Sequence, residues 1–285
     1  MTGGVERDET AAGSVGGRGT VISRRGLLGA AGLAAASLML GCARRGAGER
    51  PESAPQGSSE GGARRGRLAQ RPRPAEPGDA AKGLQPLGLG RGRDGFVFVP
   101  SGYRPDQPLP LVVMLHGAGG DGMGGLAPLH GRADDEGLIL LAPDSRGRTW
   151  DVLLGGYGPD VDFIDRALAH TFGRYAVDAE NITVEGFSDG ASYALGLGVA
   201  NGDLFQRIVA FSPGFAPPSA EKGRPHVFVS HGTSDQVLPI DRCSRRIVPA
   251  LERQGYDVRF VEFDGGHDVP QDIVDDALAW LRTRR

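Results

Sequence analysis

Short apolar runs alternate with amphipathic segments through the last two thirds of the chain. The runs fall at 96–99, 111–115, 138–141, 182–185, 208–211, 226–230 and 258–263, and each predicts a strand. Apolar residues recur at helical spacing between 160 and 175, and the segments 191–200, 240–254 and 270–282 also predict helices. Strands that alternate with helices predict an α/β fold, with a mostly parallel central sheet covered by helices on both faces. No long insertion separates 208–211 from 226–230, so we expect no separate lid domain.

The apolar run at 182–185 leads directly into Gly186-Phe187-Ser188-Asp189-Gly190. A G-x-S-x-G sequence between a strand and a helix is typical of the nucleophile elbow of serine hydrolases. In a chain with 47 glycines the pentapeptide also arises by chance, so its position after a strand is what gives it weight. The motif makes Ser188 the candidate nucleophile.

A second glycine-rich segment, His116-Gly117-Ala118-Gly119-Gly120, follows the strand predicted at 111–115. Such a segment can turn backbone N–H groups toward a developing oxyanion, and the other donor is usually the residue after the nucleophile. We therefore expect the backbone N–H groups of Ala118 and Asp189 to form an oxyanion hole. A simple turn at His116-Gly117 is the alternative, and the elbow downstream favours the oxyanion role.

An acid and a base follow the serine along the chain. Asp235 lies in the loop after the run at 226–230, and His267 comes two glycines after the run at 258–263. Because the carboxyl ends of parallel strands meet at one edge of a sheet, Ser188, Asp235 and His267 can converge there. Asp264 and Asp268 flank His267, but sequence neighbours rarely reach the correct ring nitrogen, so Asp235 is the preferred acid.

The remaining histidines predict no further catalytic chemistry. His231 precedes a glycine at a strand end and is assigned a structural role, while His130, His170 and His226 are interpreted as solvated or packed side chains. The sequence contains neither H-E-x-x-H nor paired Cys/His spacing, so we expect no metal site and no cofactor.

Four segments together resemble the motifs of α/β-hydrolases over roughly residues 94–285: L-H-G-x-G-G, G-F-S-D-G-A-S, H-G-T-S-D-x-V-x-P and G-G-H. The likeness is to small carboxylesterases of the phospholipase/carboxylesterase group and of the polyhydroxybutyrate-depolymerase or feruloyl-esterase-like groups. It implies an α/β-hydrolase fold with Ser188 as nucleophile, Asp235 as acid and His267 as base. Secreted depolymerases and feruloyl esterases often carry disulfides, whereas this domain has only Cys243, which favours a general esterase over a polymer-degrading one.

The three side-chain types suit acyl transfer. A serine hydroxyl is a weak nucleophile at neutral pH and needs a base within hydrogen-bond reach. Histidine can take that proton near working pH, and a carboxylate can fix its tautomer and stabilise the cation that forms. Trp150, Tyr157 and Met123 are candidate walls of a substrate pocket, with simple packing as the alternative.

The first 42 residues resemble a bacterial export signal. Ser23-Arg24-Arg25-Gly26-Leu27-Leu28 is similar to a twin-arginine motif, and the apolar stretch after it is too short for an ordinary membrane span. Met39-Leu40-Gly41-Cys42 resembles a lipobox that would lipidate Cys42 and anchor the protein to a membrane; release after ordinary cleavage is the alternative. We therefore expect export from the bacterial cytoplasm, as an envelope lipoprotein or a secreted or periplasmic protein.

Residues 43–89 are rich in Arg, Gly, Pro, Ser, Ala and Glu and predict a disordered tether, because they offer few large apolar side chains to bury. Residues 90–285 then form the catalytic domain. The whole chain has a formal charge of −3, but residues 81–285 hold 20 Lys and Arg against 27 Asp and Glu, a charge of −7. This charge disfavours nucleic acid as a partner.

Two functions follow from these features. The favoured one is an exported serine carboxylesterase that acts on small or medium esters. Feruloyl esterase, polyester depolymerase and phospholipase are variants of this function, so the substrate is a small-molecule or a polymeric ester. The other is a lipoprotein that keeps the hydrolase shape as a non-catalytic binding module. The sequence carries no signal for an oligomeric state.

Overall fold

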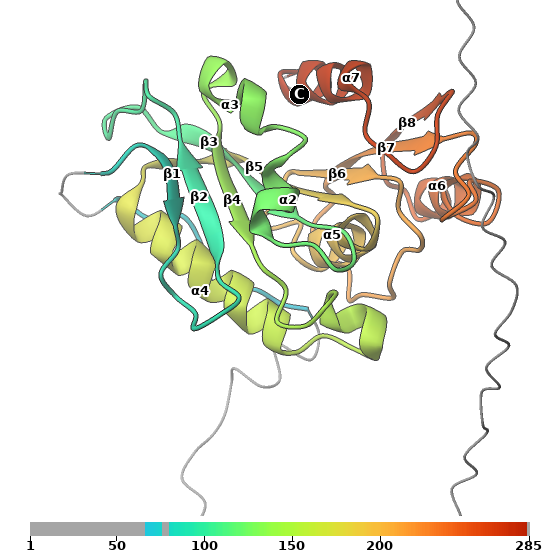
Figure 1. Cartoon of the computed structure of the whole chain (residues 1–285), viewed down its shortest axis with the longest axis horizontal. Helices are drawn as coiled ribbons and strands as arrows, with labels where there is room; N and C mark the ends of the chain where they lie inside the picture. The colour runs from blue at the N-terminus through green and yellow to red at the C-terminus, as the bar shows by residue number, and fades with distance from the viewer. Residues whose placement is uncertain (1–65, 76–79, 284–285) are drawn as a thin grey trace, which may run out of the picture. The chain divides into compact units, whose positions relative to one another are not determined.

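The computed structural model describes residues 66–75 and 80–283, and the predicted export signal lies outside these ranges (Figure 1). Within them, eight strands form one sheet: β1 (Gly83–Pro86), β2 (Gly95–Val99), β3 (Leu109–Leu115), β4 (Ile139–Pro143), β5 (Val177–Phe187), β6 (Arg207–Phe211), β7 (His226–Gly232) and β8 (Val258–Phe263). The helices are α2 (Gly122–Leu126), α3 (His130–Glu136), α4 (Pro159–Arg174), α5 (Asp189–Ala200), α6 (Ser244–Arg253) and α7 (Gln271–Leu281), with a 3₁₀ turn η1 (Asp151–Leu154).

The spatial order of the strands is β1-β2-β4-β3-β5-β6-β7-β8. Strands β3 to β8 run parallel to one another, while β2 pairs antiparallel with β4, and β1 pairs antiparallel with β2 at one side of the sheet. Strand β5 lies between β3 and β6, so the elbow at its carboxyl end stands near the centre of the sheet edge. Connections after the parallel strands therefore all reach the same edge.

Each face of the sheet is covered by its own helices (Figure 1). On one face, Leu111, Val113 and Leu115 of β3 pack with buried residues of α4, α5 and α6. On the other, Val112 and Met114 pack with α2, α3 and α7. The alternation along β3 explains its unbroken apolar sequence, because a strand covered on both faces has no solvent side. The predicted α/β fold with a mostly parallel sheet is confirmed.

The main predicted elements agree with the structure to within a few residues, and the differences have local causes. Helix α6 begins at Ser244 rather than at 240, because residues 240–243 form hydrogen-bonded turns. Strand β5 extends back to Val177, five residues before the apolar run, and the sequence did not show this part because most of its residues are polar and only partly buried or exposed. Helices α2 and α3, of five and seven residues, are too short to show a helical repeat.

The tether predicted over 43–89 is wrong for its described part. Strand β1 lies inside it, and a segment that we call the strap, residues 66–75, packs against the domain. Leu68 is only 2 % exposed and its N–H donates to Asn201 Oδ1 at 2.9 Å. Arg67 and Arg71 both pair with Asp203, at 2.9 and 2.8 Å. A few well-placed contacts thus order a segment whose composition alone indicates disorder.

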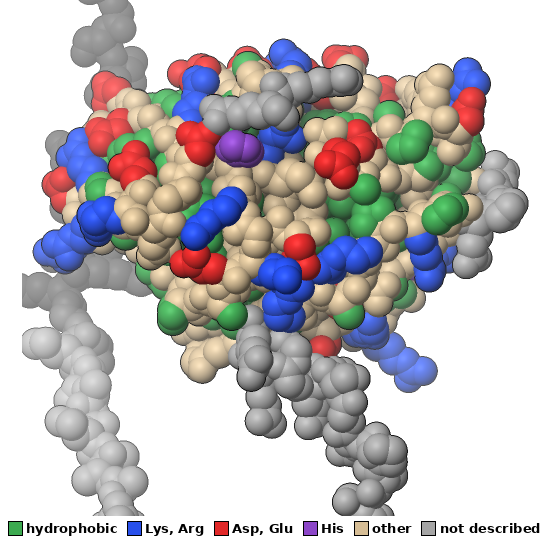
Figure 2. Space-filling view, turned by 180° about the vertical axis from the view of Figure 1, so that it is seen from behind, with side chains coloured by type: hydrophobic (Ala, Val, Ile, Leu, Met, Phe, Trp, Pro, Cys, Tyr) green, Lys and Arg blue, Asp and Glu red, His purple; other side chains and the backbone are tan. Residues whose placement is uncertain are grey.

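The surface mixes charges of both signs. In the view from behind, Lys and Arg side chains are interspersed with Asp and Glu (Figure 2). Several form exposed pairs such as Arg132–Asp275 at 2.7 Å, which contribute little to stability in water. No helix of the described ranges is long and apolar enough to span a bilayer.

Candidate active site

The turn from β5 into α5 holds Ser188 at φ 58° and ψ −118°, a conformation that L-residues rarely adopt. Two glycines make this possible. A Cβ on Gly186 would overlap the backbone of Gly190, and a Cβ on Gly190 would overlap the carbonyl oxygen of Leu115 on β3. The strand and the helix can therefore approach closely enough to lift Ser188 onto the sheet edge. The serine is 8 % exposed.

Ser188, His267 and Asp235 lie in one chain of hydrogen bonds, although they are far apart in the sequence. Ser188 is 79 positions from His267, and Asp235 is 32 positions from His267. His267 Nε2 is 2.8 Å from Ser188 Oγ, and His267 Nδ1 is 2.6 Å from Asp235 Oδ2. The carboxylate can only accept, so Nδ1 carries a proton and Nε2 of the neutral ring is free to accept from the serine hydroxyl. The ring of Phe187 packs beside the imidazole, with centroids 4.8 Å apart.

The β7 and β8 loops that carry the acid and the base approach closely at Gly232. A Cβ on Gly232 would overlap the carbonyl oxygens of Gly265 and Gly266, just before His267. The backbone N–H groups of Thr233 and Ser234 bond to carbonyls of the β8 end. The glycine at the end of β7 is therefore what lets the two loops pack together.

The Asp235 side chain is fully buried and receives hydrogen bonds on both oxygens. The N–H groups of Val237 and Leu238 each donate to Oδ1 at 2.8 Å. Burial alone would raise the pKa of Asp235, but the hydrogen bonds from Leu238 and His267 outweigh it and hold the pKa below the usual range of an aspartate. The carboxylate is thus kept ionised at neutral pH.

His231, interpreted from the sequence as structural, is a contact of this carboxylate. Its Nε2 lies 3.2 Å from Asp235 Oδ2 and 2.7 Å from the Leu238 carbonyl oxygen. Both partners are acceptors, so Nε2 carries the proton, and Nδ1 accepts from the Ser244 hydroxyl at 2.7 Å. Burial lowers the pKa of His231, which favours this neutral form. Only its spacing of four residues before Asp235 hinted at this contact in the sequence.

The glycine-rich loop after β3 packs against the elbow. A Cβ on Gly117 would lie 3.4 Å from Ser188 Cβ. The carbonyl of Gly117 accepts from His116 Nδ1 at 2.7 Å and from the Gly120 N–H at 3.1 Å. Because the C=O and N–H of one trans peptide point in opposite directions, these bonds also fix the direction of the Ala118 N–H. Within the described ranges, that N–H donates to no protein acceptor.

The second predicted oxyanion donor, the Asp189 N–H, belongs to the first residue of α5 and has no partner within the helix. Its side chain turns away to Thr149, whose Oγ1 donates to Asp189 Oδ2 at 2.6 Å. The neighbouring Arg148 carbonyl accepts from the Gly119 N–H at 2.6 Å. The segment after β4 therefore holds both the helix start and the glycine-rich loop.

Arg93, which the sequence did not single out, ties the same loop to the β4 end. Its guanidinium donates to the carbonyl oxygens of Gly120 and Ser145, both at 2.6 Å, and lies 3.2 Å from His116 Nε2. Burial lowers the pKa of His116, which fits a neutral ring that accepts at Nε2 from the Ser145 N–H at 3.0 Å. Arg93 comes before the predicted motifs and carries no signature of its own.

The three candidate pocket residues lie in different environments. Trp150 is fully buried, donates through Nε1 to the His116 carbonyl and stacks on Tyr193, so its assignment as a pocket wall is wrong. Sequence alone does not distinguish an aromatic residue under a loop from one beside it. Tyr157 is half-buried with its hydroxyl 2.9 Å from Ser219 Oγ, and Met123 is 46 % exposed. For these two, a pocket role stays a prediction.

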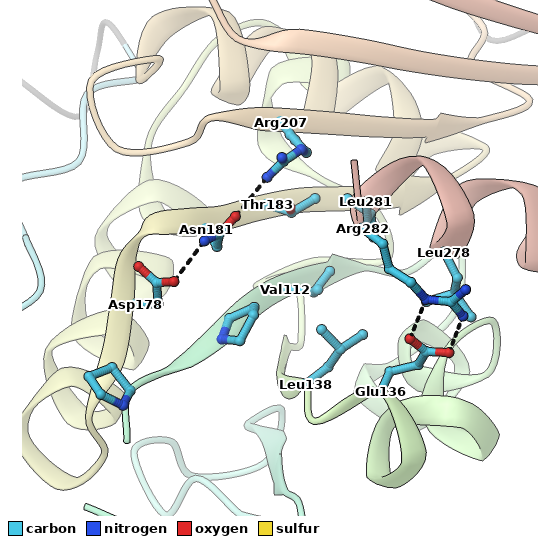
Figure 3. A pocket seen from close by; sticks show the side chains of 12 residues that line it. Val112, Glu136, Leu138, Asp178, Asn181, Thr183, Arg207, Leu278, Leu281 and Arg282 are labelled. Atoms are coloured by element: carbon cyan, nitrogen blue, oxygen red, sulfur yellow. Dashed lines mark hydrogen bonds and ion pairs between the residues drawn. The ribbon is translucent and has the colours of Figure 1, made fainter. Parts of the chain in front are cut away.

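A cavity of about 340 Å³ lies at the opposite edge of the sheet (Figure 3). Its lining comes from the amino-terminal parts of β3 and β5, the start of β6 and the end of α7, and includes Thr183, Arg207 and Leu278. The Arg207 guanidinium donates to Asn181, and Arg282 pairs with Glu136 (Figure 3). Since Ser188 stands at the carboxyl ends of the strands, this cavity is separate from the Ser188–His267 pair.

Two other sequence expectations concern metals and thiols. The described part of the chain has no group of three or more His, Cys, Asp or Glu side chains placed to hold a metal ion. Cys243 is buried with a free thiol. Cys42, the predicted lipidation site, lies outside the described residues.

The sequence is similar to known esterases. The phospholipase/carboxylesterase family matches residues 161–284. Feruloyl esterase C of Emericella nidulans is 26 % identical over 211 residues, which cover 62 % of this chain and 77 % of that protein. A bifunctional acetylxylan esterase/xylanase of Neocallimastix patriciarum is 30 % identical over 159 residues, 52 % of this chain and 22 % of the relative.

Solved structures show the same architecture. The crystal structure of esterase PE8 is 26 % identical, with a TM-score of 0.55 over 66 % of this chain and 97 % of that one. FphF, a fluorophosphonate-binding serine hydrolase of Staphylococcus aureus, is 16 % identical with a TM-score of 0.57, over 73 % of this chain and all of its own. The second likeness bears on the fold alone.

Proposed function

We propose that this chain, an α/β-hydrolase that resembles phospholipase/carboxylesterases and feruloyl esterases, is a serine carboxylesterase that works through an acyl-enzyme on Ser188. The observation that carries the proposal is the hydrogen-bond chain from Ser188 through His267 to Asp235. Ser188 lies at a strained turn beside the glycine-rich loop that follows β3. The esterase relatives support the same bond type.

In the first half of the proposed reaction, Ser188 Oγ attacks the ester carbonyl carbon while its proton passes to His267 Nε2. The carbonyl oxygen becomes negative, and the N–H groups of Ala118 and Asp189 are the donors we assign to it. The C–O bond to the alcohol then breaks, the alcohol takes the proton from His267, and the acyl group stays on Ser188. Asp235 stabilises the imidazolium through its negative charge and itself stays deprotonated.

In the second half, water replaces the alcohol. His267 Nε2 removes a proton from the water as its oxygen attacks the acyl carbon, and the same oxyanion donors act again. The bond to Ser188 Oγ breaks, the serine regains a proton from His267, and the carboxylic acid leaves. No group outside this chain and water is needed to balance the atoms.

Fluorophosphonate labelling tests the proposal together with hydrolysis of p-nitrophenyl acetate. We expect the probe to label Ser188 in the folded protein, with Ser188→Ala abolishing both labelling and hydrolysis. His267→Ala should lower kcat by at least about a thousandfold. Ser234→Ala, a change at an exposed serine near the acid, is the matched control and should retain both activities. Folded protein that neither labels nor hydrolyses esters would instead favour a non-catalytic binding module.

We also propose that residues 1–42 direct export and that Cys42 is lipidated. The supporting features are the paired Arg24 and Arg25, the short apolar stretch and the small residue before Cys42. Fractionation of bacteria that express the full chain tests both parts. Replacing both arginines by lysine should leave the protein in the cytoplasm, and Cys42→Ala should move it from the membrane fraction to the soluble fraction. Unchanged fractionation of either variant would contradict the corresponding part.

A further inference from the structure

The peptide that carries the assigned oxyanion donor is held by a buried imidazole. His116 is 1 % exposed, and its Nδ1 lies 2.7 Å from the carbonyl oxygen of Gly117. This carbonyl belongs to the same peptide as the Ala118 N–H, so a bond that holds the oxygen also sets the direction of the N–H. A carbonyl oxygen can only accept, so the contact is a hydrogen bond only when Nδ1 carries a proton. The grip on this peptide therefore depends on the tautomer of His116.

The other ring nitrogen of His116 is surrounded by donors. The Ser145 N–H donates to His116 Nε2 at 3.0 Å, and Arg93 Nη2 lies 3.2 Å from the same atom. Neither a backbone amide nor a guanidinium can accept a hydrogen bond. His116 Nε2 therefore accepts, which leaves the one proton of the neutral ring on Nδ1. The opposite tautomer would turn two lone pairs toward each other at Gly117 and crowd three N–H groups around Nε2.

Arg93 also adds a positive charge beside the ring. A second proton on Nε2 would place an imidazolium directly against the guanidinium. Burial lowers the pKa of His116 most, and the charge of Arg93 lowers it further, whereas the carboxylates of Asp144 and Asp121 act in the opposite direction. Arg93 thus opposes both the wrong tautomer and the doubly protonated ring.

The Arg93 guanidinium is itself fixed, so it can set the position of the ring. Its Nε donates to the Ser145 carbonyl oxygen, and its Nη2 donates to the Gly120 carbonyl oxygen, both at 2.6 Å. The backbone carbonyl of Arg93 accepts from Arg146 Nη1 at 2.8 Å. The guanidinium therefore joins the end of β4 to the far end of the glycine-rich loop and reaches the imidazole between them.

We propose that Arg93 is a positioning residue for ester hydrolysis: its guanidinium holds His116 in the Nδ1–H tautomer, and the ring in turn fixes the peptide whose Ala118 N–H meets the oxyanion. This inference rests on the proposed function, because it concerns the transition state of the same reaction. Arg93 does not touch the reacting atoms. It acts through His116, and its effect should appear where negative charge develops on the substrate oxygen.

The first test is hydrolysis of p-nitrophenyl acetate by full-length Arg93→Met, in which a side chain of similar length has neither donor nor charge. Complete loss of one oxyanion donor costs about a hundredfold to a thousandfold in kcat, so a donor that is only misaligned should cost about tenfold or somewhat more. KM should stay within about twofold, because the donor acts mainly in the transition state. Arg93→Lys keeps a charge near Nε2 and should retain a kcat between those of the wild type and Arg93→Met.

The second test reads the tautomer directly. NMR of protein labelled with ¹⁵N-histidine distinguishes protonated from unprotonated ring nitrogens, and the His116→Asn variant identifies the signals of His116. The wild type should show a protonated Nδ1 and an unprotonated Nε2. In Arg93→Met, part of the population should carry a proton on Nε2, and the pKa of His116 should rise toward the ordinary value of a histidine. An unchanged tautomer and pKa in Arg93→Met would overturn the proposal.

A double-mutant cycle separates action through His116 from a direct effect on the loop. Asparagine at position 116 offers a side-chain N–H near the Nδ1 position and has no ring tautomer. In the His116→Asn background, Arg93→Met should therefore lower kcat by no more than about threefold. An equal loss in both backgrounds would show that Arg93 acts through the Gly120 carbonyl alone, and would overturn the role of the tautomer.

Arg91→Met is the matched control, because Arg91 is exposed, lies two positions earlier and has no hydrogen bond within the described ranges. It should leave kcat, KM and the His116 signals unchanged. Hydrolysis that requires Ser188 but keeps its full kcat in Arg93→Met would overturn this inference and leave the proposed function standing. A folded wild type that hydrolyses no ester would overturn the proposed function, and this inference with it.

Discussion

His231 Nε2 lies 3.2 Å from Asp235 Oδ2, the same oxygen that His267 Nδ1 approaches at 2.6 Å. One carboxylate oxygen thus stands between two imidazoles of different exposure: the side chain of His231 is fully buried, and that of His267 is 13 % exposed. The Leu238 carbonyl and the Ser244 hydroxyl fix the tautomer of His231. The acid of the proposed triad is therefore oriented by a second histidine as well as by two backbone N–H groups.

Removing the His231 donor should change how Asp235 holds His267. His231→Phe keeps a ring of similar shape but leaves the carboxylate one N–H short. Asp235 then pairs more strongly with the protonated His267, so the acid limb of the pH profile of kcat/KM should move to higher pH. We expect kcat at neutral pH to fall about tenfold, the scale on which loss of an outer hydrogen-bond partner acts at metal-ligating residues.

His231→Gln provides the control for that change, because its side-chain amide can keep a donor near the original Nε2 position. It should restore the acid limb toward that of the wild type. The groups that face this pair are Asp235, His267 and Glu262, and Glu262 is paired with Arg245 at 2.5 Å. Identical pH profiles for wild type and His231→Phe would show that the contact is purely structural.

Gly190→Ala should destabilise the elbow. The added Cβ would overlap the Leu115 carbonyl oxygen on β3, and a backbone atom in a central strand cannot move aside. We expect a loss of about 1–3 kcal/mol in the free energy of unfolding, with weaker fluorophosphonate labelling of Ser188. Gly131→Ala in α3 is the control, because its Cβ meets no neighbour and alanine favours a helix. Equal Tm values for the two variants would contradict this account of the turn.

The buried Glu185 should make the protein less stable as the pH rises. It lies in β5 three residues before Ser188, is 1 % exposed, and its carboxyl oxygens have no hydrogen-bond partner among the described residues. Burial raises the pKa of Glu185 well above the usual range, so the folded protein keeps a proton that the unfolded chain releases. The folded state then binds more protons, and the free energy of unfolding falls as the pH rises above the ordinary glutamate pKa.

Glu185→Gln removes this titration, so its stability advantage over the wild type should grow with pH. The slope is about 1.4 kcal/mol per pH unit until the folded carboxyl ionises. Burial also raises the pKa of Asp160, to about 6, so Asp160 further lowers the free energy of unfolding of both proteins as the pH rises. The difference between variant and wild type cancels that shared contribution. Unfolding measured from pH 5 to pH 9 that gave parallel curves would contradict the prediction.

The strap should stabilise the domain. Leu68 is 2 % exposed and belongs to the same apolar cluster as α4 and α5, so Leu68→Ala should lower the free energy of unfolding by about 2 kcal/mol or more. Leu84→Ala at an exposed position should change it by less than about 0.5 kcal/mol. Chemical denaturation measures both. Equal stabilities would mean that residues 66–75 are not part of the folded unit.

Much of the sheet and the identity of the three candidate groups could be predicted because they leave short, local signals. Strand β3 appears in the sequence as one apolar run because both of its faces are buried. Leu111 and Val113 pack on one face, and Val112 and Met114 pack on the other. The elbow likewise is a pentapeptide, since Gly186 and Gly190 are required by contacts within that turn and with β3. The strap could not be predicted, because its order depends on Asn201 and Asp203, more than 130 residues away.

The sequence by itself determined that strands alternate with helices and that a serine, an aspartate and a histidine follow strand ends in that order, because hydrophobic periodicity and turn chemistry act over a few residues. Only the tertiary structure decided that Trp150 is buried, that His231 contacts the acid and that Arg93 holds the glycine-rich loop. These are contacts between segments far apart in the chain. Their partners are chosen by the packing of the sheet and its helices, which no local pattern records.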